Sequence, residues 1–101
     1  MVARIWHAYT SFENAPVFET MLKSEIFPGI RKKGIKGFKD IQLLIRNLDK
    51  EVEFITIMWF DSMESIKGFA GDVHDKAVIY PAAKSLLLRF DERSQHYDVS
   101  Y

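Results

Sequence analysis

Residues 51–60 have the sequence EVEFITIMWF, and this stretch decides the fold. Its β-branched and aromatic side chains are typical of a strand, and side chains along a strand point alternately to opposite faces of a sheet. Beyond Glu53 both of these faces are largely apolar, so the sheet needs a cover on each side. One predicted face carries Val52, Phe54, Thr56, Met58 and Phe60, and the other carries Glu53, Ile55, Ile57 and Trp59.

Turn-forming residues divide the rest of the chain into six or seven elements in the order β-α-β-β-α-(α)-β. This order predicts a single α+β domain over residues 1–101, with a ferredoxin-like split βαβ fold and a four-stranded antiparallel sheet. The segment 38–48 forms a β-hairpin with 51–60. The expected strands are 2–10, 38–48, 51–60 and 94–101, and the expected helices are 14–27, 61–71 and a short one over 81–88.

Local signals suggest where the two longer helices begin and end. Asn14 can accept hydrogen bonds from free N–H groups at the start of the first helix, and we expect Pro28 with Gly29 to end or kink it. Asp61 and Glu64 have the spacing of a capping box at the start of the second helix, which is expected to stop near Gly71.

The helices of this fold cover only one face of its sheet, so the second apolar face requires another cover. Burying one large apolar side chain stabilises the folded state by about 1.5–3 kcal/mol. A face left in water loses several such contributions. The chain has no further strands from which to build a second sheet. The sequence therefore predicts a homodimer in which the sheets of two copies pack against one another.

The composition excludes several classes of protein. Fourteen basic and fourteen acidic side chains give a net charge of zero, which supplies no long-range field for nucleic acid or anionic lipid. The chain has no cysteine, and it has no nucleotide-binding glycine motif or closely spaced metal ligands, so we expect neither a metal nor another cofactor. No apolar run approaches the roughly 20 residues of a membrane helix, and a cytoplasmic protein with no membrane partner is expected.

Four segments resemble the antibiotic biosynthesis monooxygenase family of the dimeric α+β barrel superfamily. They are RIWHAYT (4–10), TIMWFDSMESIKGFAGD (56–72), KAVIYP (76–81) and LLLRFDERSQHYDV (86–99). The resemblance implies a homodimer with a pocket in each subunit between the sheet and its helices. It implies the fold more firmly than the reaction, because the superfamily also contains haem-degrading enzymes, isomerases and stress-responsive proteins.

Quinone-forming members of that family are thought to work without metal or flavin, the substrate's own anion reducing oxygen. Such a site needs an apolar slot, a base for a phenolic proton and donors for the developing oxyanion. His7 lies at a plausible match to a polar pocket residue of the family and is expected to be the base or oxyanion partner, assisted by His74 and Tyr80. The expected pocket side chains are Tyr9, Phe18, Trp59 and Phe69.

Each of these residues also has a purely structural explanation. His7 can be a partly buried side chain bonded to the backbone, and His74 can belong to a polar surface loop beside Asp72 and Asp75. Most of the aromatic side chains would then belong to the core or to the dimer interface. The charged side chains of residues 89–93 are expected to form ion pairs at a subunit edge.

The leading hypothesis is a cofactor-independent monooxygenase-like enzyme that acts on a small or polycyclic aromatic molecule. The first alternative is a non-catalytic small-molecule-binding or stress-response protein that uses the same pocket. The second alternative is an isomerase or lyase of the same fold.

Overall fold

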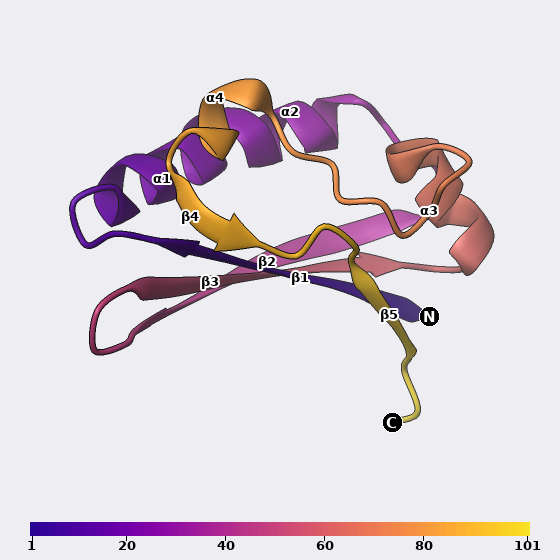
Figure 1. The fold of residues 1–101 in the computed structure, drawn as a ribbon. Helices are drawn as coiled ribbons and strands as arrows, with labels where there is room; N and C mark the ends of the chain where they lie inside the picture. Colours follow the sequence, from indigo (N-terminus) through magenta and orange to yellow (C-terminus); the bar gives the residue numbers. More distant parts are fainter.

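The fold is an antiparallel sheet with helices packed on one of its faces (Figure 1). The computed structural model describes residues 1–101. The strands lie in the order β2-β3-β1-β4, and β5 pairs with the same edge of β1 as β4 does. This is the ferredoxin-like α+β fold that the sequence predicts. The elements are β1 Val2–Thr10, α1 Ala15–Met21, η1 Leu22–Ile26, α2 Phe27–Lys32, β2 Phe38–Asn47, β3 Val52–Phe60, α3 Met63–Ala70, α4 Pro81–Lys84, β4 Leu87–Phe90 and β5 Gln95–Asp98.

The core lies between the sheet and the helices. Along β3 every second residue from Val52 to Phe60 is buried, and the residues between them are half-buried. The predicted division of this strand into two faces is therefore confirmed. Phe54 and Phe60 on β3 and Phe18 on α1 are among the largest fully buried side chains, and Phe18 meets Phe54 edge to face with ring centroids 4.9 Å apart.

The first helix continues past Pro28, where the sequence predicts an end or a kink. It runs through α1, a π-helical turn η1 and α2 to Lys32. In the π turn the N–H of Phe27 bonds to the carbonyl of Leu22, five residues earlier. A proline inside an α-helix lacks an N–H and crowds the carbonyl four residues before it. The wider π turn just before Pro28 removes this conflict, so the helix does not end there.

The start of α3 differs in detail from the predicted capping box. Ser62, rather than Asp61, occupies the N-cap, and its side chain accepts a hydrogen bond of 3.3 Å from the N–H of Ser65. Asp61 instead accepts a hydrogen bond from the hydroxyl of Ser65. The helix ends at Ala70, and Gly71 follows with a φ of +82°, as predicted.

The last third of the chain departs most from the predicted pattern. The helix begins at Pro81 as expected, but it ends at Lys84, and the segment Leu87–Phe90, whose residues are apolar except for Arg89, forms β4. A short apolar run does not distinguish a strand from a buried helix by its periodicity. The expected last strand is shorter and is confined to Gln95–Asp98. Both short strands pair with β1, so the sheet has five strands where four were expected.

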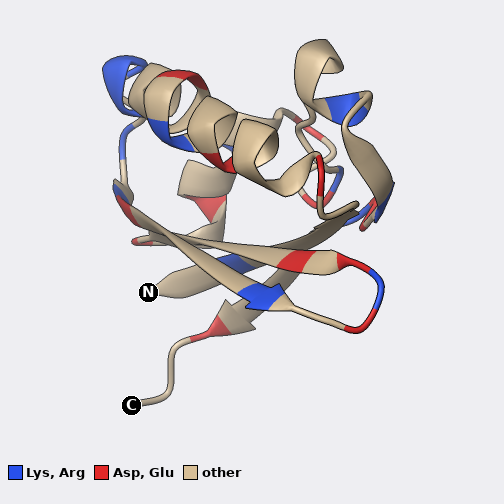
Figure 2. Ribbon diagram, turned by 90° about the vertical axis from the view of Figure 1, so that its left-hand side faces the viewer, with Lys and Arg blue, Asp and Glu red and all other residues tan.

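The outer face of the sheet points away from the helices. The register of β1 against β3 places Ile5 opposite Ile57 and His7 opposite Ile55, and directly opposed residues share a face. Acidic and basic residues are interspersed over the helices and loops (Figure 2). No helix has the length and apolar character needed to cross a membrane. On the three long strands the outer face carries Ala3, Ile5, His7, Tyr9, Gln42, Leu44, Arg46, Glu53, Ile55, Ile57 and Trp59.

Gly37 and Gly29 give a matched test of the packing around the start of α3. Gly37 has a φ of +86°, and a Cβ there would lie 2.7 Å from the Cβ of Ser65 at the start of α3. Gly37→Ala should therefore destabilise the protein by about 2 kcal/mol or more. Gly29 lies inside α2 with no atom near the position of an added Cβ, so Gly29→Ala should stabilise the protein by about 0.5–1 kcal/mol. Urea denaturation of both variants measures the two effects, and equal stabilities would contradict this packing.

Candidate functional site

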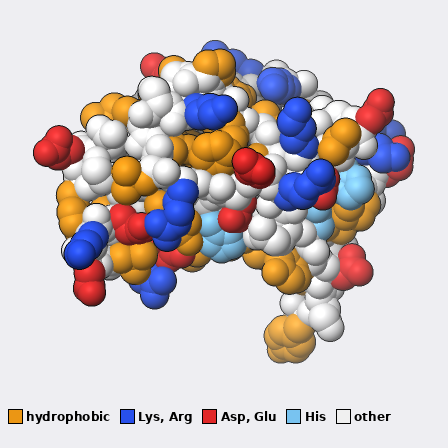
Figure 3. Space-filling view, viewed as in Figure 1, with side chains coloured by type: hydrophobic (Ala, Val, Ile, Leu, Met, Phe, Trp, Pro, Cys, Tyr) orange, Lys and Arg blue, Asp and Glu red, His pale blue; other side chains and the backbone are white.

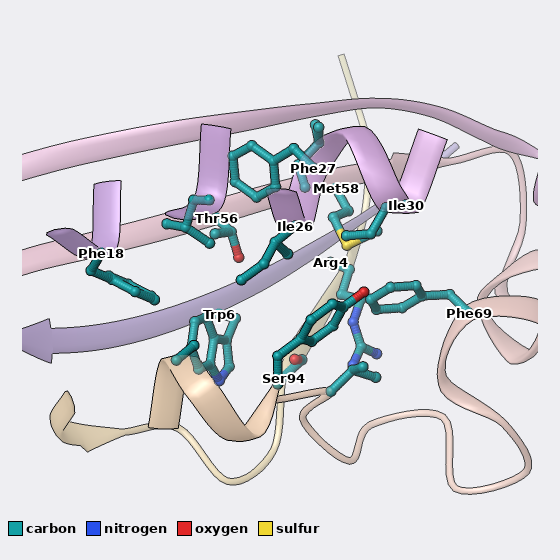
Figure 4. Close-up of a pocket in the computed structure, with 15 residues that line it drawn as sticks. Arg4, Trp6, Phe18, Ile26, Phe27, Ile30, Thr56, Met58, Phe69 and Ser94 are labelled. Carbon is teal, nitrogen blue, oxygen red and sulfur yellow. The ribbon is translucent and has the colours of Figure 1, made fainter. Parts of the chain in front are cut away.

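A cavity of about 60 Å³ lies between the sheet and the helices. Its wall is built from the three long strands, the long first helix, α3, the connection between β4 and β5, and the segment 71–86. This last segment crosses the sheet between α3 and β4 (Figures 1 and 4). Most of the wall is apolar or aromatic. The aromatic side chains in the wall are Trp6, Phe18, Phe27, Phe69 and Tyr80.

The alternation of β1 decides which of its side chains reach the cavity. Arg4 and Trp6 point toward the helices, and both line the cavity. They lie opposite Met58 and Thr56 of β3, which line it as well. The indole N–H of Trp6 donates a hydrogen bond of 2.7 Å to the carbonyl of Asp91, which fixes the ring in the wall.

The π turn shapes the helical side of the cavity. Phe18, Leu22 and Ile26 follow one another at intervals of four residues, the spacing of one helix face. Because the turn is wider than an α-helical one, Phe27 lines the cavity together with Ile26, and Ile30 follows. Single π turns occur frequently at functional sites.

Three hydroxyl groups in the wall make no hydrogen bond to the protein. They belong to Thr56, Tyr80 and Ser94, and none of these three residues is exposed on the surface. Every fully buried polar side-chain atom of the protein has a hydrogen-bond partner. These three hydroxyls have none, so they are not fully buried. All three residues line the cavity, and Figure 4 shows the oxygen of Thr56 directed into it.

Arg4 supplies the only charged side chain of the cavity wall. Its guanidinium donates to the carbonyls of His74 and of Lys76, the latter at 2.9 Å, and its Nη1 lies 3.0 Å from Nε2 of His96. The ring of Phe69 lies 5.4 Å from the guanidinium carbon. Burial lowers the pKa of Arg4 to about 10, and Asp75 opposes this shift, so the group stays charged at neutral pH.

The structure divides the sequence-predicted site residues between two faces of the sheet. Phe18, Phe69 and Tyr80 line the cavity. His7, Tyr9 and Trp59 lie on the outer face, across the sheet from it. These three residues therefore do not share the cavity with Phe18, Phe69 and Tyr80. Side chains of neighbouring residues in a strand point in opposite directions, so Trp6 reaches the cavity and His7 does not.

His7 and Tyr9 belong to a polar network on the outer side of the sheet. Nδ1 of His7 lies 2.6 Å from the carboxylate of Asp91, which also accepts the backbone N–H of His7 at 3.0 Å. The hydroxyl of Tyr9 donates to Glu53 at 3.1 Å. Burial and this hydrogen bond raise the pKa of Tyr9. Trp59 donates to Gln42 at 2.8 Å on the same face.

His74 lies next to the cavity wall but is not part of it. Its backbone carbonyl accepts from Arg4, and its ring lies 5.6 Å from the ring of His96 between centroids. Arg89 pairs with Glu51, and Arg93 pairs with Asp75 at 2.8 Å, so both form ion pairs within their own chain. The protein has no group of three histidine, aspartate or glutamate side chains that could hold a metal ion.

Sequence reasoning missed Arg4, Thr56 and Ser94 as members of the site. A signal existed for the first two. Thr56 is the one polar residue on the helix-facing side of β3, and Arg4 shares a face with Trp6 on β1. A polar side chain on an otherwise buried face indicates either a satisfied core group or a site. Ser94 lies in the break between β4 and β5, which the sequence pattern does not reveal.

The geometry defines a ferredoxin-like α+β protein with an aromatic-lined cavity beneath its helices. Among the solved structures that match it is the crystal structure of a "putative antibiotic biosynthesis monooxygenase" from Bacillus cereus, with a TM-score of 0.68, 16% sequence identity, and coverage of 99% of this chain and 93% of that one. At this identity the likeness shows the fold alone. No family model matches the sequence, and no curated protein matches it.

The contact between Arg4 and His96 predicts a pH dependence of stability. Burial, together with the charge of Arg4 and with His74, lowers the pKa of His96 below its ordinary 6.5. The unfolded chain then binds a proton more readily than the folded protein, so folding stability falls as the pH drops below about 6.5. Thermal unfolding at about pH 7.5 and about pH 5.5 should show this drop, and His96→Gln should reduce it. An equal drop in both proteins would remove His96 from the explanation.

Proposed function

We propose that the protein is a cofactor-independent monooxygenase-like enzyme that binds a small aromatic molecule in the cavity beneath its helices. The observation that carries the proposal is the wall of this cavity, in which aromatic rings surround free hydroxyl donors. The Bacillus cereus neighbour bears the name of an antibiotic biosynthesis monooxygenase, and the chain resembles that family in the four segments described above.

The proposed chemistry needs no electrons from outside the substrate. A phenolic substrate with a neighbouring CH₂ group gives its phenolic proton to water as it enters the cavity, and the resulting anion passes an electron to O₂. Over the complete reaction the CH₂ becomes C=O and O₂ supplies the carbonyl oxygen and one water, so atoms and electrons balance. Tyr80 donates its hydroxyl to the developing oxyanion, and Trp6 with Phe69 holds the ring.

The size of the cavity favours a single ring over a polycyclic substrate. An engineered cavity of about 150 Å³ holds one benzene molecule, whereas this cavity measures about 60 Å³. A ring therefore enters only when part of the wall moves. The segment 71–80 is the part with no helix or strand, and it contributes the half-exposed Val78 and the ring of Tyr80 to the wall. We expect this segment to open.

A non-catalytic binding protein is the second candidate. It is favoured by the absence of any imidazole or carboxylate from the cavity wall. Without such a base, a phenol has to give its proton to water as it enters. The isomerase or lyase alternative depends on a base that moves protons on the substrate, so the same observation weighs more heavily against it.

Oxygen uptake tests the proposed reaction. Hydroxylated aromatics of one to three rings, each with a CH₂ group beside the phenolic ring, are supplied to the protein in an oxygen electrode. We expect uptake above the uncatalysed rate, with loss of about 100-fold in Tyr80→Phe, the size of effect seen when one oxyanion donor is removed. Tyr97→Phe, which changes an exposed tyrosine, serves as the control and should retain full activity.

The outcomes separate the two candidates. Equal turnover in Tyr80→Phe and the unaltered protein would remove Tyr80 from the reaction. If the aromatic molecules perturb the resonances of Trp6 and Phe18 in an NMR titration without any oxygen uptake, the binding protein replaces the enzyme. If no aromatic molecule binds, both the enzyme and the binding protein are contradicted.

We further propose that the protein is a homodimer, formed by the outer faces of two sheets. Ile5, Ile55, Ile57 and Trp59 are half-buried there, and Leu44 is 45% exposed. These apolar side chains have no cover within their own chain. A self-complementary face of this kind suits a two-fold symmetric pair.

The C-terminal tail supports the same arrangement. It leaves the sheet on the side opposite the helices (Figure 1) and stands clear of the body of the molecule (Figure 3). Tyr97, Val99 and Tyr101 in this region are large and exposed. A second copy packed on the outer face would lie within reach of these apolar side chains.

A charge placed on the outer face tests the dimer. Sedimentation at micromolar concentration should give twice the chain mass of 11.8 kDa. Ile57→Glu should shift it to a single chain, because dimer formation would bury an unpaired carboxylate. Val73→Glu, on an exposed loop residue, should leave the dimer intact. A folded single chain for the unaltered protein would contradict the proposal.

A further inference from the structure

Arg4 is a buried cation with no carboxylate in direct contact, since Asp75, whose charge favours the charged form of Arg4, is itself paired with Arg93. The residue is 2% exposed, and no carboxylate lies within 4.0 Å of its guanidinium, although seven other ion pairs of this kind occur in the protein. Charges buried in proteins are nearly always paired, because removing them from water is costly. The two nearest imidazoles, of His74 and His96, do not supply a negative charge.

The hydrogen bonds of Arg4 leave part of its guanidinium free. A guanidinium carries five N–H groups. Nη1 contacts the His74 carbonyl and Nε2 of His96, and Nη2 donates to the Lys76 carbonyl. Nε has no acceptor in the protein. Every fully buried polar side-chain atom of the protein has a hydrogen-bond partner, so Nε is not fully buried. The space that Arg4 lines is the cavity.

We propose that Arg4 is the recognition site for a negatively charged oxygen of the ligand, so that the cavity selects a small aromatic acid. The acid group is a carboxylate or an ionised phenol on a single ring. This inference rests on the proposed function, because it assumes that the cavity is the ligand site. Nε and Nη2 form one edge of the planar guanidinium, and this edge can donate two parallel hydrogen bonds to an anionic oxygen group.

The remaining groups of the wall fit such a ligand. Figure 4 places Arg4 and Phe69 toward one end of the cavity, with Trp6 and Phe18 toward the other. A ring lying against Trp6 with its anionic group toward Arg4 also has the hydroxyls of Ser94 and Tyr80 in the same wall. The apolar part of the wall then holds the ring, and the free donors hold the charge.

Arg4 also has a structural role, which the experiment must separate from ligand recognition. Its bonds to the carbonyls of His74 and Lys76 tie the segment 71–80 to β1. Replacing Arg4 can therefore loosen this segment. A comparison of ligands on the unaltered protein avoids that difficulty.

The test uses benzoate, its neutral analogue benzamide, and toluene as an uncharged ring. Each is titrated into the full chain at neutral pH, and binding is followed by the ¹H–¹⁵N resonance of the Trp6 indole. We expect benzoate to bind at least tenfold more tightly than benzamide. Equal affinities would overturn the inference. If toluene and benzamide bind and benzoate does not, the cavity is a ligand site but Arg4 does not recognise an anion. If none of the three perturbs Trp6, both the cavity site and the anion site are contradicted.

Variants then assign the preference to Arg4. Arg4→Lys keeps the charge and should retain a preference for benzoate, whereas Arg4→Gln should abolish it while toluene still binds. Arg93→Gln removes an exposed charge that pairs with Asp75 and should leave the preference unchanged. A preference that survives in Arg4→Gln, or that disappears in Arg93→Gln, would place the anion elsewhere.

Discussion

The alternation of side chains along the two central strands is the constraint on which the rest of the structure depends. On β1 it sends Arg4 and Trp6 beneath the helices and His7 and Tyr9 to the outer face. On β3 it separates a fully buried face from a half-buried one. One face of the sheet therefore holds the core and the cavity, and the other offers an apolar surface with a polar network. The chemistry available in the cavity is set by Arg4 and three hydroxyls, and it includes no histidine.

Much of the fold could be predicted from local sequence signals. β1 and β3 are rich in β-branched and aromatic residues, and turn residues separate β2 from β3, so the bounds of these three strands agree with the prediction to within about one residue. The π turn could not be predicted, because Pro28 followed by Gly29 resembles a helix end and only the packed helix reveals its continuation. The strand at Leu87–Phe90 was missed because a segment of four residues carries too little periodicity.

The candidate site was predicted only in part, for a different reason. Phe18, Phe69 and Tyr80 could be chosen as large aromatics near expected helices, and they line the cavity. The choice of His7 depended on which face of β1 turns toward the helices. That face is fixed by the register against β3, in which His7 lies opposite Ile55. A register is a long-range property, and shifting it by one residue exchanges the two faces of a strand.

The cavity and its charge suggest how the parts of the fold act together. Arg4 joins β1 to the segment 71–80 and carries the unpaired charge, so the group that closes the cavity is also the one that would recognise its ligand. A crystal structure of the protein soaked with benzoate tests this claim most directly. It should show the ring against Trp6 and the carboxylate beside Nε of Arg4, with the segment 71–80 displaced. A carboxylate directed toward Phe18, or a ligand bound outside the cavity, would contradict it.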